Sequence, residues 1–140
     1  MKATHKTAAE ELYHGDKNIR EAAYTLDGGF LDMTARMLYY ALFHFEKALL
    51  HYRGNYTESH KQTHIQFRGT FVKSGEVAAD GSELIRILQT QREQADYGYF
   101  TSLTHEELTG YLEQVREFGA RVSRLIADGE DVSPPPIDPT

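Results

Sequence analysis

The chain has 140 residues, 40% of them hydrophobic, and its formal net charge at pH 7 is -6. This length predicts a single domain with a substantial core, and the 9 tyrosines and 7 phenylalanines indicate a folded protein. The acidic balance argues against a broad basic face for duplex nucleic acid, although a few arginines and lysines would suffice for a small RNA site. The absence of cysteine excludes disulfides and thiolate metal sites. Residues 1–12 lack the apolar core of a signal peptide, so we expect a soluble cytoplasmic protein with no membrane segment.

A first helix is predicted to begin after Thr7, because Thr7 and Glu10 have the spacing of a capping box. Apolar residues then recur at helical period, and Gly28-Gly29 ends the pattern. They are Ala8, Leu12, Ile19, Ala23 and Leu26. The short turn that follows predicts an antiparallel hairpin with the next helix.

Residues 31–52 predict a central helix, since this segment is apolar almost all the way round. Arg53-Gly54-Asn55 is expected to end it. Its most apolar face carries Leu38, Leu42, Phe45 and Leu49, which we expect to be buried in the core.

One polar seam runs along the opposite side of this central helix. It contains Asp32, Arg36, Tyr40, His44, Lys47 and His51. The pattern favours hydrogen bonds from the seam to flanking helices, with Asp32 and Arg36 forming an ion pair. The alternative is that the seam faces a groove or a partner chain.

Three more helices follow, each announced by a capping-box spacing. The first starts after Ser59 and ends at Gly75, with Ile65, Phe67, Phe71 and Val72 as its apolar residues. The second starts after Asp80 and carries Leu84, Ile85, Leu88 and Ala95. The last starts after Thr104, carries Leu108, Tyr111, Leu112, Val115, Phe118, Val122 and Leu125, and closes at Gly129.

The whole pattern predicts an all-α fold, an antiparallel up-and-down bundle of about five helices. We place the bundle in residues 1–128. Residues 129–140, with four prolines and three acidic residues, predict a disordered tail.

The segment 91–100 combines charge with aromatic residues at the end of the fourth predicted helix. Arg92 and Asp96 share a helix face, Gly98 releases the chain, and Tyr97 and Tyr99 flank that glycine. The pattern favours an intrahelical salt bridge followed by aromatic cover for the bundle end. A functional site is the alternative.

His60 and His64 have the i,i+4 spacing by which two imidazoles on one helix can hold a metal ion. No third ligand accompanies them, so an exposed polar helix start is the favoured interpretation. No nucleotide-binding, hydrolase or di-iron motif is present either. We therefore predict neither a metal site nor a cofactor.

Several ordered segments together resemble the HEPN domain family. They are the AAEEL start, residues 35–44 (ARMLYYALFH), residues 47–50 (KALL), His60 followed by residues 67–72, and residues 92–97 (REQADY). The resemblance is to the small stand-alone branch of the family, whose members are often paired with a minimal nucleotidyltransferase. It covers most of the chain and leaves out the proline-rich tail.

The resemblance implies a five-helix bundle that forms homodimers. Many HEPN proteins are metal-independent ribonucleases, in which an arginine and a histidine four to six residues later form a site across the dimer interface. Many act with a nucleotidyltransferase as toxin and antitoxin, and in some pairs the antitoxin adenylylates a tyrosine two residues after that histidine.

This sequence departs from the family pattern at one position. Arg92 matches the arginine, but Tyr97 stands five residues later and no histidine follows within reach. A phenol is a poorer proton shuttle at neutral pH than an imidazole. Tyr99 stands where the modified tyrosine is expected.

Three functional hypotheses follow. The first is a homodimeric HEPN protein of a toxin–antitoxin-like pair, which binds a nucleotidyltransferase and RNA or nucleotide near Arg92. Its candidate binding residues are Arg36, Tyr40, His44, Lys47 and Asp96. The second is an active metal-independent endoribonuclease that uses Arg92 with Tyr97 or His44. The third is a purely structural dimerisation module.

Overall fold

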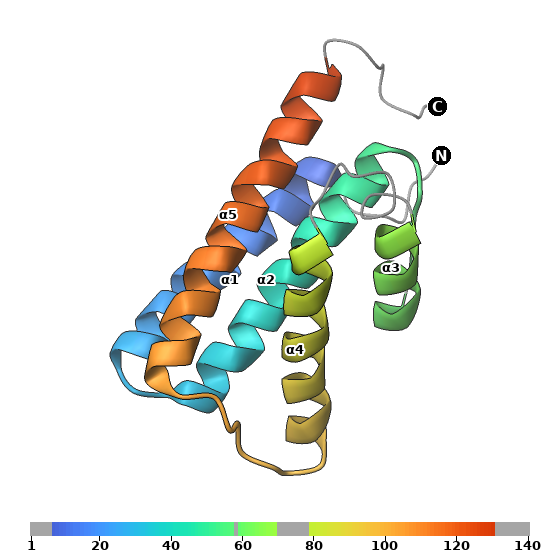
Figure 1. The fold of residues 1–140 in the computed structure, drawn as a ribbon. Helices are drawn as coiled ribbons and strands as arrows, with labels where there is room; N and C mark the ends of the chain where they lie inside the picture. Colours follow the sequence, from blue (N-terminus) through green and yellow to red (C-terminus); the bar gives the residue numbers. More distant parts are fainter. Residues whose placement is uncertain (1–6, 58, 70–78, 131–140) are drawn as a thin grey trace.

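The structure, a computed structural model, describes residues 7–57, 59–69 and 79–130. These residues form five helices and no strand, which confirms the predicted all-α bundle. The helices are α1 (Ala8–Asp27), α2 (Leu31–Tyr52), α3 (His60–Phe67), α4 (Ala79–Asp96) and α5 (His105–Glu130). Helix α2 packs against all four of the others and is central, as predicted (Figure 1).

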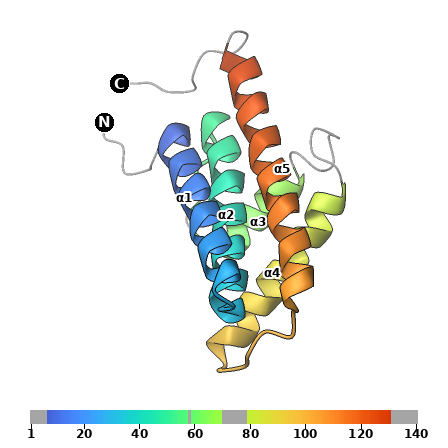
Figure 2. The same ribbon diagram turned by 90° about the vertical axis from the view of Figure 1, so that its left-hand side faces the viewer.

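Helices α1, α2 and α5 lie side by side along most of their length, whereas α4 crosses the bundle at an angle (Figure 2). In Figure 1, α3 and α4 lie on the side of α2 that faces away from α1 and α5. The polar side chains on α2 therefore meet different neighbours on its two sides.

The predicted starts of α1, α3 and α5 are confirmed. Thr7 and Glu10 exchange both capping-box hydrogen bonds at the start of α1, and Thr104 and Glu107 do the same before α5. The Ser59 side chain accepts a hydrogen bond from the Gln62 amide at the start of α3. These side chains satisfy amide groups that have no partner within the helix.

Three predicted boundaries differ from the structure. Helix α4 begins at Ala79, so Asp80 lies inside it instead of capping it. Helix α5 continues through Gly129 to Glu130, because a glycine inside a helix costs only about 1 kcal/mol and does not by itself end it. Helix α3 ends at Phe67, while Phe71, Val72, Gly75 and residues 131–140 lie outside the described residues.

The predicted apolar faces form the core. Leu38, Leu42, Phe45 and Leu49 of α2 are buried, as predicted, together with Leu84, Ile85 and Leu88 of α4 and Leu108, Leu112, Val115, Phe118 and Val122 of α5. Ile65, one of the apolar residues of the third predicted helix, is 57% exposed. The buried face of α3 consists of Thr63, His64 and Phe67 instead, so two of its three buried side chains are polar.

The ring of Phe45 lies between two helical glycines from different elements. A Cβ built on Gly15 of α1 would lie 2.5 Å from Phe45 Cε1, and one built on Gly119 of α5 would lie 2.6 Å from Phe45 Cζ. Real Cβ atoms do not approach other carbon atoms that closely. Phe45 therefore sets the distance at which α1 and α5 pack against α2.

We predict that Gly119→Ala destabilises the fold by about 1 to 3 kcal/mol, because the added methyl group overpacks the core against Phe45. Gly110→Ala in the same helix is the matched control. No atom lies within 4 Å of a Cβ there, and alanine favours a helix by up to about 1 kcal/mol over glycine. Urea unfolding should show opposite shifts for the two variants, and equal shifts would contradict the role given to Phe45.

Candidate functional site

Four side chains from α2 and α3 form what we call the histidine–tyrosine network. The Tyr39 hydroxyl lies 2.7 Å from His60 Nδ1 and 2.9 Å from His64 Nε2. His64 Nδ1 lies 2.7 Å from Glu46 Oε1. Glu46, His64 and Tyr39 are buried, whereas His60 is partly exposed. The network thus runs from a carboxylate in the core to an imidazole at the surface.

In the part of the chain that the structure describes, the i,i+4 spacing of His60 and His64 serves neither a metal site nor an exposed helix start. It directs both rings at one hydroxyl on α2, so the interpretation as an exposed helix start is wrong for His64, which is only 3% exposed. Phe43 completes the packing, because its ring stacks on that of His60 at 4.0 Å between centroids. Within the described residues, no three His, Asp or Glu side chains are placed to share a metal ion.

The pKa values of the two groups at the ends of the network, Glu46 and His60, are shifted in opposite directions. Burial raises the pKa of Glu46, although His64 and Arg68 oppose that shift. Burial lowers the pKa of His60 to about 4, and the positive charge of Arg92 adds to this effect. His60 is therefore a neutral imidazole at pH 7. Burial also raises the pKa of Tyr39, so its hydroxyl keeps its proton.

Arg92 of α4 lies over this network. Its guanidinium carbon is 5.5 Å from the centre of the Tyr39 ring, and its Nη1 is 3.6 Å from Asp96 Oδ2. A hydrogen bond to Tyr40 raises the pKa of Arg92 further above its ordinary value. The aromatic rings hold the Arg92 side chain in place. Because the side chain is 28% exposed, it is still reachable from solvent.

The polar seam of α2 contacts a buried carboxylate of α1. Glu11 is fully buried, with Oε1 2.6 Å from His44 Nδ1 and Oε2 3.5 Å from Lys47 Nζ. Burial raises the pKa of Glu11, but the His44 hydrogen bond and the Lys47 charge outweigh this and lower it overall. The hydrogen bonds to a flanking helix that were predicted for the seam are thus present at His44.

Other seam residues lie apart from this contact. The Asp32 carboxylate accepts a hydrogen bond from the Thr101 amide at 2.5 Å, a partner other than the predicted Arg36. Arg36 is exposed and His51 is buried. Asp32 therefore ties α2 to the segment between α4 and α5.

The fold brings most of the predicted binding residues around His60. Lys47, His44 and Arg92 each contribute to the lowered pKa of His60, and the Tyr40 ring lies 6.2 Å from it. We call the partly exposed side chains of Tyr40, His44, Lys47, His60 and Arg92 the basic patch. It joins helices α2, α3 and α4, which no single sequence segment could show.

The two candidate tyrosines lie outside the basic patch. Tyr97 and Tyr99 follow the last residue of α4 on either side of Gly98, whose φ of 82° turns the chain. Tyr97 is 82% exposed and Tyr99 is 67% exposed. The positive charge of Arg92 acts instead on the imidazole of His60 in α3.

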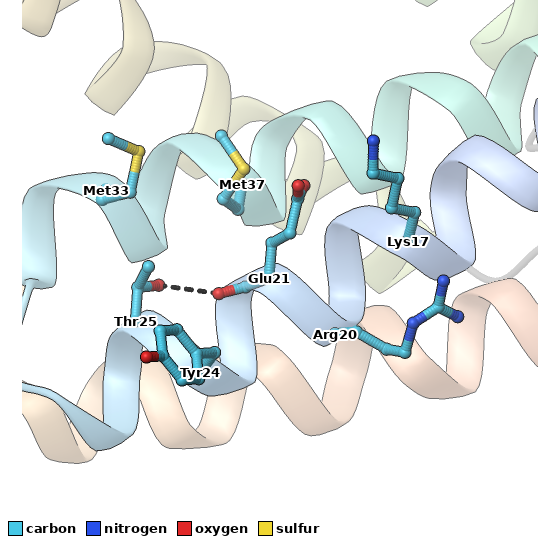
Figure 3. Close-up of a pocket in the computed structure, with 7 residues that line it drawn as sticks. All are labelled: Lys17, Arg20, Glu21, Tyr24, Thr25, Met33 and Met37. Carbon is cyan, nitrogen blue, oxygen red and sulfur yellow. Dashed lines mark hydrogen bonds between the residues drawn. The ribbon is translucent and has the colours of Figure 1, made fainter.

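A separate surface hollow of about 570 Å³ lies between α1 and α2. Figure 3 shows its lining, which includes Lys17, Glu21 and Tyr24 from α1 and Met33 and Met37 from α2, with the Thr25 hydroxyl donating to the Glu21 carbonyl. It contains none of the predicted site residues. None of the helices in the described part of the chain is long and apolar enough to span a membrane.

The five-helix bundle agrees with the class of protein that the family comparison shows. The model of the HEPN domain matches residues 9–125, and the chain belongs to the HEPN domain family. It is also similar to a UPF0332 protein of Thermotoga maritima, with 26% identity over 108 residues that cover 77% of this chain and 82% of that protein. The resemblance noted in the sequence is therefore confirmed at the level of the family.

We predict that the free energy of unfolding falls as the pH is lowered from 6.5 to about 4. Over this range the unfolded chain protonates His60 at its ordinary pKa while the folded state resists protonation, so acid favours unfolding, by up to about 3 kcal/mol. His60→Asn should flatten the pH dependence measured by urea unfolding. His105→Asn, at an exposed position of α5, is the control and should leave it unchanged.

Proposed function

We propose that this HEPN protein binds single-stranded RNA through the basic patch. One observation carries the proposal: the Arg92 guanidinium lies over the Tyr39 ring, partly exposed, beside the neutral imidazole of His60. A guanidinium offers several donors in a fixed plane, which matches the oxygens of a phosphate. Asp96, at 3.6 Å and 60% exposed, is a weak competitor for those donors.

The size of the basic patch favours a single strand over a duplex. The chain has a net charge of -6, so it lacks the broad positive surface that a duplex backbone requires. A few cations beside aromatic rings are typical of sites that bind unstacked nucleotides. Tyr40 supplies a partly exposed ring next to Arg92, and Lys47 supplies a second positive charge.

We further propose that the protein is a homodimer and the HEPN component of a toxin–antitoxin-like pair with a nucleotidyltransferase. The segment after α4 supports this, because Tyr97, Tyr99 and Phe100 are 82%, 67% and 83% exposed. Exposed aromatic side chains of this kind are enriched at protein interfaces. Tyr99 is the proposed site of nucleotidyl transfer.

A second candidate function is metal-independent cleavage of RNA. It is favoured by the two imidazoles of the basic patch, His44 and His60, both of which contact the ring of Phe43. Arg92 would stabilise the charge that develops on the phosphorus oxygens. His44 or Tyr97 would give a proton to the leaving oxygen, and His44 is favoured because it belongs to the basic patch whereas Tyr97 lies outside it. A purely structural module would show neither RNA binding nor cleavage.

We predict that Arg92→Ala weakens binding of a labelled single-stranded RNA by about 10- to 100-fold, the effect of losing a charged hydrogen bond to phosphate. The matched control is Arg86→Ala, which removes the same charge from an exposed Glu83 pair on the same helix. Fluorescence anisotropy at fixed salt measures both variants. Equal affinities for the two variants would exclude Arg92 as the phosphate ligand.

The partner proposal has its own test. Incubation with ATP and the proposed nucleotidyltransferase partner should add one AMP group and release pyrophosphate, and intact mass detects the addition. Tyr99→Phe should abolish the addition, because Tyr99 supplies the nucleophilic hydroxyl, and Tyr97→Phe should preserve it. Addition to the Tyr99→Phe variant would overturn the assignment.

A further inference from the structure

The donors and acceptors of the histidine–tyrosine network can be arranged in only two ways when Glu46 is ionised. The Tyr39 hydroxyl has one proton to donate and lies within hydrogen-bond distance of two ring nitrogens. It donates to one ring and must accept from the other. The Nδ1 atom of His64 faces Glu46. The protonation of His64 decides which ring accepts the hydrogen bond from Tyr39 and which ring donates one to it.

In the first arrangement His64 is neutral. Its Nδ1 then carries the ring proton, because this nitrogen lies 2.7 Å from Glu46 Oε1 and a bare nitrogen there would face an ionised carboxylate, and its Nε2 accepts a hydrogen bond from the Tyr39 hydroxyl. His60 must then donate its Nδ1–H to the Tyr39 oxygen, which leaves His60 Nε2 as a bare proton acceptor. Since His60 is the only partly exposed member of the network, this acceptor lies at the basic patch.

In the second arrangement His64 is an imidazolium paired with the Glu46 carboxylate. His64 Nε2–H donates to the Tyr39 oxygen, the Tyr39 hydroxyl donates to His60 Nδ1, and His60 Nε2 carries a proton. The two arrangements differ by a single proton. It enters at His60 Nε2 and is stored as charge on His64, while His60 is neutral in both.

We propose that the histidine–tyrosine network is a proton relay, in which His60 takes a proton from a hydroxyl bound at the basic patch and passes the charge through Tyr39 to the buried His64–Glu46 pair. Surrounding charges favour this direction. Arg92, Lys47 and His44 act against a positive charge on His60, whereas Glu46 stabilises one on His64. Arg68 also acts on Glu46 and opposes the rise in its pKa that burial causes.

The relay rests on the proposed binding of RNA only for the identity of the hydroxyl that gives its proton to His60. With RNA bound, the 2′-hydroxyl gives its proton to His60 Nε2 while its oxygen bonds to phosphorus. The bond from phosphorus to the 5′-oxygen breaks, and the side chain of His44, whose Nδ1 lies 2.6 Å from Glu11 Oε1, gives that oxygen a proton. A 2′,3′-cyclic phosphate and a 5′-hydroxyl result. The relay then returns its proton to water, and His44 takes one up.

The first test needs neither RNA nor a variant. Protein labelled with 15N in histidine is titrated between about pH 8 and pH 5, across the ordinary histidine pKa, while two-bond correlation spectra report which ring nitrogens carry protons. We expect the two nitrogens of His60 to exchange roles while the ring stays neutral, as His64 becomes doubly protonated. Direct conversion of His60 to an imidazolium over this range would overturn the relay.

Tyr39→Phe provides the second test, because it removes the hydroxyl and retains the ring below Arg92. We expect the exchange of roles at His60 to disappear. Tyr40→Phe is the matched control, because the Tyr40 ring also lies beside His60. Among the described residues, only the Tyr39 hydroxyl forms a hydrogen bond with His60 Nδ1. The exchange should persist in this control. Persistence in Tyr39→Phe as well would overturn the assignment.

RNA measurements separate the relay from the proposed function. If RNA is cleaved, Tyr39→Phe should lower kcat about 100-fold or more, the usual effect of losing a general base, with RNA affinity unchanged. An unchanged kcat would overturn the catalytic role of the relay. If no RNA is bound, the proposed function fails while the exchange at His60 still supports the relay.

Discussion

The contact of Phe45 with two glycines sets the geometry on which the rest of the bundle depends. Gly15 and Gly119 allow α1 and α5 to approach one ring of α2 more closely than any larger residue would permit. That approach brings Glu11, one turn before Gly15, against the neighbouring turn of α2, where it meets His44 and Lys47. A packing constraint in the core thus positions charged groups at the edge of the basic patch.

Two buried carboxylates are difficult to explain by stability alone. Removing a carboxylate from water costs several kcal/mol, and replacing a buried ion pair with apolar side chains is often neutral or stabilising. Yet Glu11 and Glu46 are both fully buried, and each lies within 2.7 Å of an imidazole nitrogen. Clusters of perturbed ionisable groups are typical of functional sites. Glu11 contacts the basic patch directly at His44, whereas Glu46 is connected to His60 of the patch through His64 and Tyr39.

The sequence predicted the helices well because their signals are local. Thr7 with Glu10 and Thr104 with Glu107 mark two helix starts within four residues, and the apolar face of α2 repeats at helical period. The network of Tyr39, His60 and His64 has no such local signal, since it joins residues 21 and 25 positions apart. The spacing of the two histidines was visible, but the hydroxyl they share became apparent only once α3 packed on α2.

The position of His60 changes how the departure from the family pattern is interpreted. A motif such as arginine followed by histidine on one helix records a spatial requirement, namely an imidazole beside a guanidinium. That requirement can be met by residues from different helices. Here Arg92 acts from α4 and His60 from α3, with the ring of Tyr39 contacting both. The missing histidine after Arg92 therefore does not leave the guanidinium without a neighbouring imidazole, and under the proposed relay this imidazole is the group that would take up a proton.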